Sequence, residues 1–233
     1  MELLEDFKDV FDPKLAKEGA NVKPMRIEMT PGWTQPQRQP IRRYTPAVTA
    51  AIKQELDEQL AAGILEKSDA LSGSPVHMVV KPSAPSGYRF CIDFSKLNKS
   101  VVSHPYPLPN IQTVLDAAGG AQYFALLDLR QGYWQFPVEP ESRSILSVQV
   151  LGEVYQQARV AMGFVDASFY VQSTVEHGMG SLIGNGVSVY LDDIFIYAVT
   201  FPGFFKLLKE VFVRLRVMRL RLKAESARWA CPL

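Results

Sequence analysis

Three aspartates are the residues whose type and spacing in this sequence point most directly to chemistry. Asp192 and Asp193 are adjacent in the stretch VSVYLDDIFIYA, and Asp128 stands near the end of YFALLDL. The pair alone is better explained as the tip of a hairpin, because aspartate is a common turn residue. A third carboxylate suggests more, since Mg²⁺ binds through carboxylates together with substrate phosphates. We therefore predict that the three side chains converge on a site for two divalent ions about 3.5 to 4 Å apart, which supports in-line phosphoryl transfer.

The segments around the aspartates predict the elements that position them. YFALLDL reads as a strand buried on both faces, and residues 187–198 read as a hairpin with the aspartate pair at its tip. A helix that Asp166 can cap precedes this hairpin. The last predicted helix carries one apolar stripe, formed by Phe204, Leu208, Val211, Leu215 and Met218.

The earlier part of the chain predicts further helices and strands. Thr45 begins a helix that ends at Gly63, residues 76–94 read as a β-hairpin, and residues 109–120 read as a short helix. Two more strands flank Gly152. Helices and hairpins in this order predict an α+β fold in which an antiparallel sheet is backed by helices.

Composition excludes several classes of protein. The fractions of 47% hydrophobic and 21% charged residues are typical of an ordinary soluble protein, and no run of about 18 apolar residues predicts a membrane span. Two cysteines support neither a disulfide framework nor a zinc cluster, which suits a reducing compartment inside the cell, cytoplasmic or nuclear. Residues 1–44, rich in Pro, Gln and Arg, predict an extended arm on the domain.

Charges are segregated along the chain, although the formal net charge is only +1. Residues 104–199 carry three basic and nine acidic side chains, whereas residues 200–233 carry eight basic and two acidic ones. An acidic centre followed by a basic segment suits a carboxylate metal site beside a phosphate-binding surface. The other interpretation is an amphipathic helix with a solvated basic face, and the charges alone favour it.

Five short motifs give the chain a resemblance to a known family. They are LNK (residues 97–99), PYPLP (105–109), LLDLRQGYWQ (126–135), GFVDASFYVQ (163–172) and YLDDIFIYA (190–198). In their type and order the chain resembles the reverse transcriptases of gypsy-class LTR retrotransposons, relatives of the retroviral enzymes. The resemblance implies an RNA-directed DNA polymerase with the palm and fingers of a right-hand polymerase and no thumb. It places an arm at residues 1–44, the fingers at about 45–102 and 136–166, and the palm at about 103–135 and 167–233.

The same resemblance implies a role for each acidic residue. Asp128 and Asp192 correspond to the residues that bridge two Mg²⁺ or Mn²⁺ ions, and Asp193 corresponds to the third acidic member. The implied partners are a primer on an RNA or DNA template and deoxynucleoside triphosphates. Thumb and ribonuclease H domains of a longer polyprotein are implied as well, and no membrane partner is expected.

Five further residues are implied to bind substrate: Lys81, Arg89, Tyr133, Met162 and Gln172. Arg89, with Lys81 as its partner, would grip the incoming triphosphate. Tyr133 would exclude a ribose 2′-hydroxyl, Met162 would border the nucleotide, and Gln172 would help to hold template and substrate. Without the resemblance, the two basic residues read as solvated charges and the tyrosine reads as a buried core residue.

Some positions depart from the family's pattern and leave a second interpretation open. Ala161 and Ser168 replace prolines, and Ile145 stands where the family commonly has a lysine, which predicts a less preorganised nucleotide pocket. The chain also ends about where the family would enter the primer-grip hairpin and the thumb, so we expect weak primer–template binding by this chain alone. The alternative to an active polymerase core is a catalytically silent, degenerate retroelement-derived module that at most binds nucleic acid.

Overall fold

The structure is a computed structural model that describes residues 2–35, 42–82 and 86–230. The chain forms two compact units, each assembled from segments that are far apart in the sequence. Unit 1 consists of Met1–Lys23, His104–Phe136 and Ser168–Leu233, and unit 2 consists of Pro24–Ser103 and Pro137–Ala167. In these described residues, no helix is both long and apolar enough to cross a lipid bilayer.

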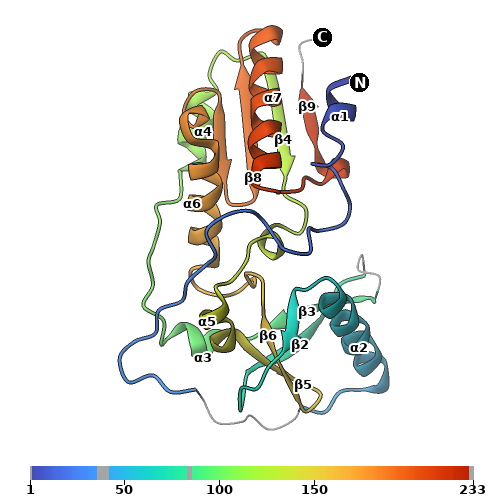
Figure 1. Ribbon diagram of the computed structural model, residues 1–233. Coiled ribbons are helices and arrows are strands. Elements are labelled where there is room, and N and C mark those ends of the chain that lie inside the picture. Colours follow the sequence, from blue (N-terminus) through green and yellow to red (C-terminus); the bar gives the residue numbers. More distant parts are fainter. Residues whose placement is uncertain (1, 36–41, 83–85, 231–233) are drawn as a thin grey trace. The chain divides into compact units, whose positions relative to one another are not determined.

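A four-stranded antiparallel sheet forms the centre of unit 1 (Figure 1). Its strand order is β7 (Val187–Tyr190), β8 (Asp193–Ala198), β4 (Tyr123–Asp128) and β9 (Arg228–Ala230). Along β4, Ala125 and Leu127 are buried, whereas the residues between them are half-buried. The prediction of a strand buried on both faces is therefore wrong, because only the face that bears Ala125 and Leu127 is sealed by packing.

Helix α7 (Phe201–Val217) packs against β8 and β4 (Figure 1). The Thr200 hydroxyl accepts a hydrogen bond of 3.3 Å from the Gly203 N–H, and Pro202 suits the first turn, so the sequence itself begins the helix here. All five residues of the predicted apolar stripe are buried, which confirms that prediction.

The other helices of unit 1 are short except for α6 (Ala167–Met179), which the sequence also predicts. They are α1 (Glu2–Asp6), α4 (Ile111–Ala117) and the 3-10 turns η1 (Gly132–Gln135), η3 (Gly180–Leu182) and η4 (Ala224–Ser226). The Asn110 side chain caps α4 by accepting a hydrogen bond of 2.9 Å from the Gln112 N–H.

Several basic residues of the 200–233 segment are engaged in ion pairs inside unit 1. Arg214 pairs with Glu210, Arg216 with Asp9, and Arg219 with Glu18. The Arg216 guanidinium also lies 4.1 Å from the centre of the Phe7 ring. These contacts favour the interpretation of α7 as an amphipathic helix with a basic outer face over a dedicated phosphate-binding surface.

Unit 2 is built on a five-stranded sheet with helix α2 (Pro46–Ala61) against it (Figure 1). The strand order is β1 (Leu65–Lys67), β6 (Glu153–Gln157), β5 (Ser147–Val150), β2 (Ser74–Val80) and β3 (Tyr88–Ile92). The short elements α3 (Ser95–Asn98), α5 (Pro140–Arg143) and η2 (Ser144–Leu146) complete it. The predicted β2–β3 hairpin and the two predicted strands around Gly152 are confirmed, but β2 and β5 run parallel, so this sheet is mixed rather than antiparallel as predicted.

Helix α2 follows its sequence signals closely. The Thr45 side chain caps its first turn with a 3.4 Å hydrogen bond from the Val48 N–H, and the chain leaves the helix through Gly63, whose φ is 65°. Its buried residues Ile52 and Leu56 pack into a core with side chains of β1, β2 and β5.

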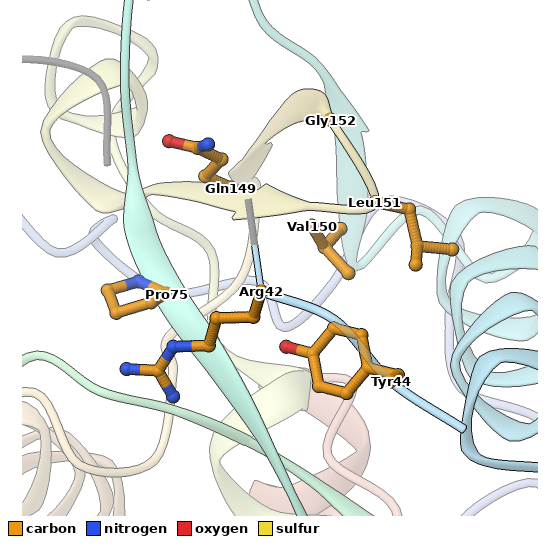
Figure 2. Close-up of a pocket in the computed structure, with 7 residues that line it drawn as sticks. All are labelled: Arg42, Tyr44, Pro75, Gln149, Val150, Leu151 and Gly152. Carbon is orange, nitrogen blue, oxygen red and sulfur yellow. The ribbon is translucent and has the colours of Figure 1, made fainter. Parts of the chain in front are cut away.

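The predicted N-terminal arm does not form one separate piece. Its first 23 residues belong to unit 1 and the rest to unit 2, and residues 36–41 lie outside the described part. Figure 2 shows Arg42 and Tyr44 lining a small pocket with Pro75 of β2 and residues 149–152 at the β5–β6 turn. Since the Tyr44 hydroxyl donates a 2.8 Å hydrogen bond to the Val76 carbonyl, this part of the predicted arm is bound to the β2 strand.

Candidate active site

Asp128 and Asp193 lie opposite each other at the ends of the two central strands of the unit 1 sheet. Asp128 is the last residue of β4, Asp193 is the first residue of β8, and the two are direct partners in the antiparallel pair. Directly opposite side chains lie on the same face of a sheet. This is the half-buried face, which also carries Leu126 and Phe195. The predicted pairing of a strand end with a hairpin tip therefore brings two carboxylates together.

Asp192 lies in the two-residue turn between β7 and β8. Leu191, the other turn residue, has a φ of 56°, a left-handed conformation that is unusual for a leucine. The Asp192 carbonyl accepts a hydrogen bond of 3.0 Å from the Leu129 N–H, which ties the turn to the end of β4. The backbone of this turn is therefore held from the same strand that carries Asp128.

Gly132 approaches the Asp192 side chain closely. A Cβ atom placed on Gly132 would lie 3.1 Å from both Cβ and Oδ2 of Asp192. A side chain here would make the Asp192 carboxylate give way by a few tenths of an ångström, so glycine suits this close approach. Gly132 is not among the predicted site residues, although it lies within the motif LLDLRQGYWQ, four residues after Asp128.

The electrostatics of the three aspartates are those of crowded carboxylates. Burial, and then the charge of Asp128, raise the pKa of Asp192 above its ordinary value. Burial also raises the pKa of Asp193, with the charges of Asp192 and Asp128 acting in the same direction. Negative charge is thus concentrated at the half-buried ends of β4 and β8, and a cation bound there would relieve the repulsion between the carboxylates.

These aspartates do not by themselves form a closed metal site. Across the described residues, no three or more His, Cys, Asp or Glu side chains are grouped so that they could hold a metal ion. Asp128 and Asp193 share a face, the Asp192 carboxylate lies against Gly132, and the convergence of all three on one cation site stays a prediction. The set still suits Mg²⁺, because this ion uses one or two carboxylates plus substrate phosphates rather than a complete protein cage.

Gln172 of α6 supports the aspartate turn from its buried side. Its Oε1 accepts a hydrogen bond of 2.5 Å from the Leu191 N–H, and its Nε2 donates one of 2.8 Å to the Val189 carbonyl. The side chain is fully buried, with 0% exposure. The sequence analysis grouped Gln172 with the substrate-binding residues, and this burial corrects that view, because no polar atom of the side chain faces solvent.

Glu176 and Tyr106 continue this support outward. The Gln172 amide nitrogen also donates a 2.8 Å hydrogen bond to the Glu176 carboxylate, which accepts a second one of 2.7 Å from the Tyr106 hydroxyl. Glu176 fixes which way the amide points, because a flipped amide would set oxygen against the Val189 carbonyl and the carboxylate. Sequence reasoning assigned no role to Glu176 or Tyr106, although Tyr106 lies in the quoted motif PYPLP.

Tyr133, the predicted gate, lies next to Gly132 on η1 and is half-buried. Its hydroxyl oxygen is 2.9 Å from the Ser168 Oγ in the first turn of α6. A half-buried ring differs from the fully buried core residue of the alternative interpretation. The role of Tyr133 at a nucleotide stays a prediction.

Lys81 and Arg89 belong to the β2–β3 hairpin of unit 2. Arg89 pairs directly with Val79, and directly opposite side chains lie on the same face of a sheet, so Val79 and Arg89 point to one face. The opposite face, with Met78 and Phe90, packs against the core of unit 2. Arg89 is therefore on the outer face of this hairpin, Lys81 directly follows the end of β2, and their contact with a triphosphate stays a prediction.

Met162 is 63% exposed, in a loop of unit 2. Asn98 of the LNK motif holds that loop with both ends of its amide: Nδ2 donates to the Gly163 carbonyl at 2.9 Å, and Oδ1 accepts from the Val165 N–H at 3.0 Å. Asn98 thus positions the loop that carries Met162, a role that the LNK motif alone did not predict.

Comparison with known proteins gives the family context. Residues 79–230 match the family described as "Reverse transcriptase (RNA-dependent DNA polymerase)". The chain is similar to the retrovirus-related Pol polyprotein from transposon opus of Drosophila melanogaster, with 27% identity over 229 residues, 97% of this chain and 23% of that protein. It is also similar to the Pol polyprotein from transposon gypsy of the same species, with 31% identity over 155 residues, 65% of this chain and 15% of that protein. The chain thus spans less than a quarter of the length of these relatives.

Solved structures share the fold. The chain matches a foamy viral protease-reverse transcriptase in complex with double-stranded DNA, with a TM-score of 0.83, 21% identity, and coverage of 99% of this chain and 40% of that one. A second structure of the foamy viral enzyme, in complex with an RNA/DNA hybrid, matches with a TM-score of 0.83, 22% identity, and coverage of 97% and 30%. The predicted fold class, an α+β arrangement of polymerase palm and fingers, is confirmed by these matches.

Proposed function

The chain belongs to the reverse transcriptase (RNA-dependent DNA polymerase) family, and on that premise we propose that it is a polymerase core that adds deoxynucleotides to a primer 3′ end. The observation that carries the proposal is that Asp128 lies opposite Asp193 at the ends of strands β4 and β8, with Asp192 in the adjoining turn. Unit 1 then acts as the palm and unit 2 as the fingers.

Asp128 and Asp192 are the residues that we assign to two divalent cations, Mg²⁺ or Mn²⁺, with Asp193 as the third acidic group. The donor set fits hard cations, because these carboxylates are crowded and partly buried and substrate phosphates can complete the coordination. When bound, such cations activate the primer 3′-hydroxyl and stabilise the charge on the transferred phosphate.

The other protein groups at this edge act by holding positions. The Leu129 N–H and the Gln172 amide fix the backbone of the turn on both sides of Asp192. Gly132 leaves room for the Asp192 carboxylate. Such positioning matters because a misplacement of about 1 Å can reduce a rate by about 100-fold.

Nucleotide contacts are assigned to four of the predicted residues. Arg89, with Lys81 beside it, binds the triphosphate through the outer face of the β2–β3 hairpin, and Met162 borders the base and sugar. Tyr133 excludes a ribose 2′-hydroxyl by occupying the space that it needs. Gln172 is instead a positioning residue for the aspartate turn.

The proposed substrates are deoxynucleoside triphosphates and a primer on an RNA or DNA template. Two similar foamy viral structures are complexes with double-stranded DNA and with an RNA/DNA hybrid, which supports a primer–template duplex as the partner. The similar Pol polyproteins support a place for this core within a longer protein that carries further domains, such as a thumb and ribonuclease H.

A catalytically silent module is the second candidate, and a specific observation favours it. Ala161 and Ser168 depart from the family's pattern around the nucleotide pocket. A silent module would keep the fold and bind nucleic acid without extending a primer.

Single-nucleotide incorporation on an RNA template at low salt, with Mg²⁺ or Mn²⁺, tests the proposal. The chain should extend the primer by one nucleotide. Asp128→Asn and Asp192→Asn should each abolish this product while the protein stays folded. Asp57→Asn, an exposed position on α2, is the matched control and should extend normally. Duplex binding without product from the unaltered chain would favour the silent module.

A further inference from the structure

One face of helix α6 reaches both the aspartate turn and the gate tyrosine. Ser168 and Gln172 are four residues apart and therefore neighbours on the same face of the helix. Gln172 bonds to Leu191 and Val189, whereas the Ser168 Oγ lies 2.9 Å from the Tyr133 hydroxyl. The same helix face thus contacts two parts of the proposed active site.

The Ser168 hydroxyl is a firm anchor because α6 is firmly held. Ala167 and Val171, on either side of it in the helix, are 1% and 0% exposed, and the Gln172 side chain is bound to the β7–β8 hairpin. The backbone at Ser168 therefore has little freedom to move relative to the sheet of unit 1. A hydroxyl on this backbone is a fixed point to which another side chain can be tied.

The Tyr133 ring needs such a fixed point. The residue follows Gly132 on a short 3-10 turn and is only half-buried, so packing alone leaves its ring some rotational freedom. The hydrogen bond is made at the hydroxyl oxygen, the side-chain atom farthest from the backbone. At this position it restrains the orientation of the ring most. Since a steric gate discriminates by where its ring edge lies, restraint at this end bears directly on selectivity.

We propose that Ser168 is a specificity-determining residue that holds the Tyr133 ring in its gating position by this hydrogen bond. The inference rests on the proposed function and adds a second residue to the gate. It also gives a reason for the serine at this position, where the resemblance led us to expect a proline: a proline has no side-chain hydroxyl with which to bind the tyrosine.

The test is a double-mutant cycle on nucleotide selectivity. Ser168→Ala and Tyr133→Phe remove the same hydrogen bond from opposite sides, so each should lower the preference for deoxy- over ribonucleotides by about three- to ten-fold, in line with the loss of one hydrogen bond. The double variant should lose no more than either single variant, because the bond can be removed only once. Ser173→Ala is the matched control, since the Ser173 hydroxyl donates its hydrogen bond to the Tyr170 carbonyl within α6, and it should leave selectivity unchanged.

Selectivity is measured as the ratio of kcat/KM for a deoxy- and a ribonucleoside triphosphate in single-nucleotide incorporation by the full chain. If turnover is too slow, the ratio of the dissociation constants of the two triphosphates on a primer–template complex serves the same purpose. Relaxed selectivity in Tyr133→Val with unchanged selectivity in Ser168→Ala overturns the role of Ser168 and leaves the gate standing. Unchanged selectivity in Tyr133→Val overturns the gate assignment and the role of Ser168 with it. Absence of triphosphate binding by the unaltered chain overturns the proposed function itself.

Discussion

The charges on Asp192 and Asp193 oppose folding at neutral pH. Burial is the main cause of the raised pKa of both groups, and the nearby charge of Asp128 adds to it. A raised pKa means that the folded state binds the proton more tightly than the unfolded state does. This tighter proton binding stabilises the folded state fully only below the unfolded pKa of about 3.9. The stabilisation is lost as the pH rises through the folded pKa. Above that range both carboxylates lower the stability of unit 1.

Asp192→Asn should therefore stabilise the metal-free protein while it abolishes nucleotide incorporation. We expect the melting temperature at pH 7 to rise by about 1 to 3 °C. The gain should shrink as the pH falls toward 4, because the unaltered carboxyl group then takes up a proton in the folded state. Thermal melts between pH 4 and pH 8 check this, with exposed Asp57→Asn as the control. A drop of several degrees would show that Asp192 has a structural role instead.

Gly132→Ala tests the close approach of η1 to the turn. The added methyl group would lie 3.1 Å from the Asp192 Cβ and Oδ2, so the carboxylate must shift by a few tenths of an ångström. We expect kcat to fall by about ten-fold, because catalytic groups tolerate little displacement, while the triphosphate KM and the melting temperature change little. If the melting temperature fell clearly and kcat fell only as far as the loss of folded protein explains, the cause would be general unfolding and not displacement of Asp192.

Helix α6 works as one positioning element through Ser168, Gln172 and Glu176, which follow one another at intervals of one helical turn. Each makes its own contact: with the Tyr133 hydroxyl, with the β7–β8 hairpin, and with the Tyr106 hydroxyl. Because Gln172 is fully buried, its hydrogen bonds are the ones whose loss is most costly.

Gln172→Leu should consequently damage both stability and activity. Leucine is close in size but leaves the Leu191 N–H and the Val189 carbonyl without their present partner, so the free energy of unfolding should fall by about 2 to 4 kcal/mol. Nucleotide incorporation should fall by more than the unfolded fraction explains, because the turn that carries Asp192 loses its support. Denaturant titrations and incorporation rates measure the two effects, and Gln122→Leu, at an exposed position, is the control. Normal incorporation by the folded fraction would contradict the supporting role.

Local signals in the sequence predict the elements better than they predict the contacts between them. Helices α2 and α7 follow from a cap, a first-turn proline and an apolar stripe, all of which are read within one segment. The parallel pairing of β2 with β5 joins residues more than 70 positions apart, and no local pattern specifies it. The candidate site divides in the same way. The hairpin that carries Asp192 and Asp193 is a local pattern, whereas the buried support from Gln172 and the approach of Gly132 depend on packing that only the three-dimensional structure reveals.

Across the whole molecule, the net charge of +1 does not show how many of the basic side chains are paired with carboxylates. Arg214, Arg216 and Arg219, three of the eight basic residues in the 200–233 segment, form ion pairs with acidic residues of unit 1. An arginine that neutralises a carboxylate contributes little to the neutralisation of phosphates. The segment is therefore a weaker site for nucleic acid than its composition suggests.

Binding of a primer–template duplex should accordingly be weak and only moderately sensitive to salt. Each neutralised phosphate adds about −0.9 to the slope of log K against log salt concentration, and we expect a slope shallower than about −5 for this chain. Arg89→Ala should reduce the magnitude of the slope by about one, as the loss of a single phosphate contact does. Arg216→Gln and Arg219→Gln should leave affinity and slope unchanged and lower stability by up to about 1 kcal/mol each, because they remove exposed ion pairs. Fluorescence titrations of a labelled duplex from 20 to 200 mM salt, about the range over which phosphate contacts dominate, decide the matter. If the two glutamine variants weakened binding as Arg89→Ala does, the basic segment would be a phosphate-binding surface after all, and its ion pairs would have to open when the duplex binds.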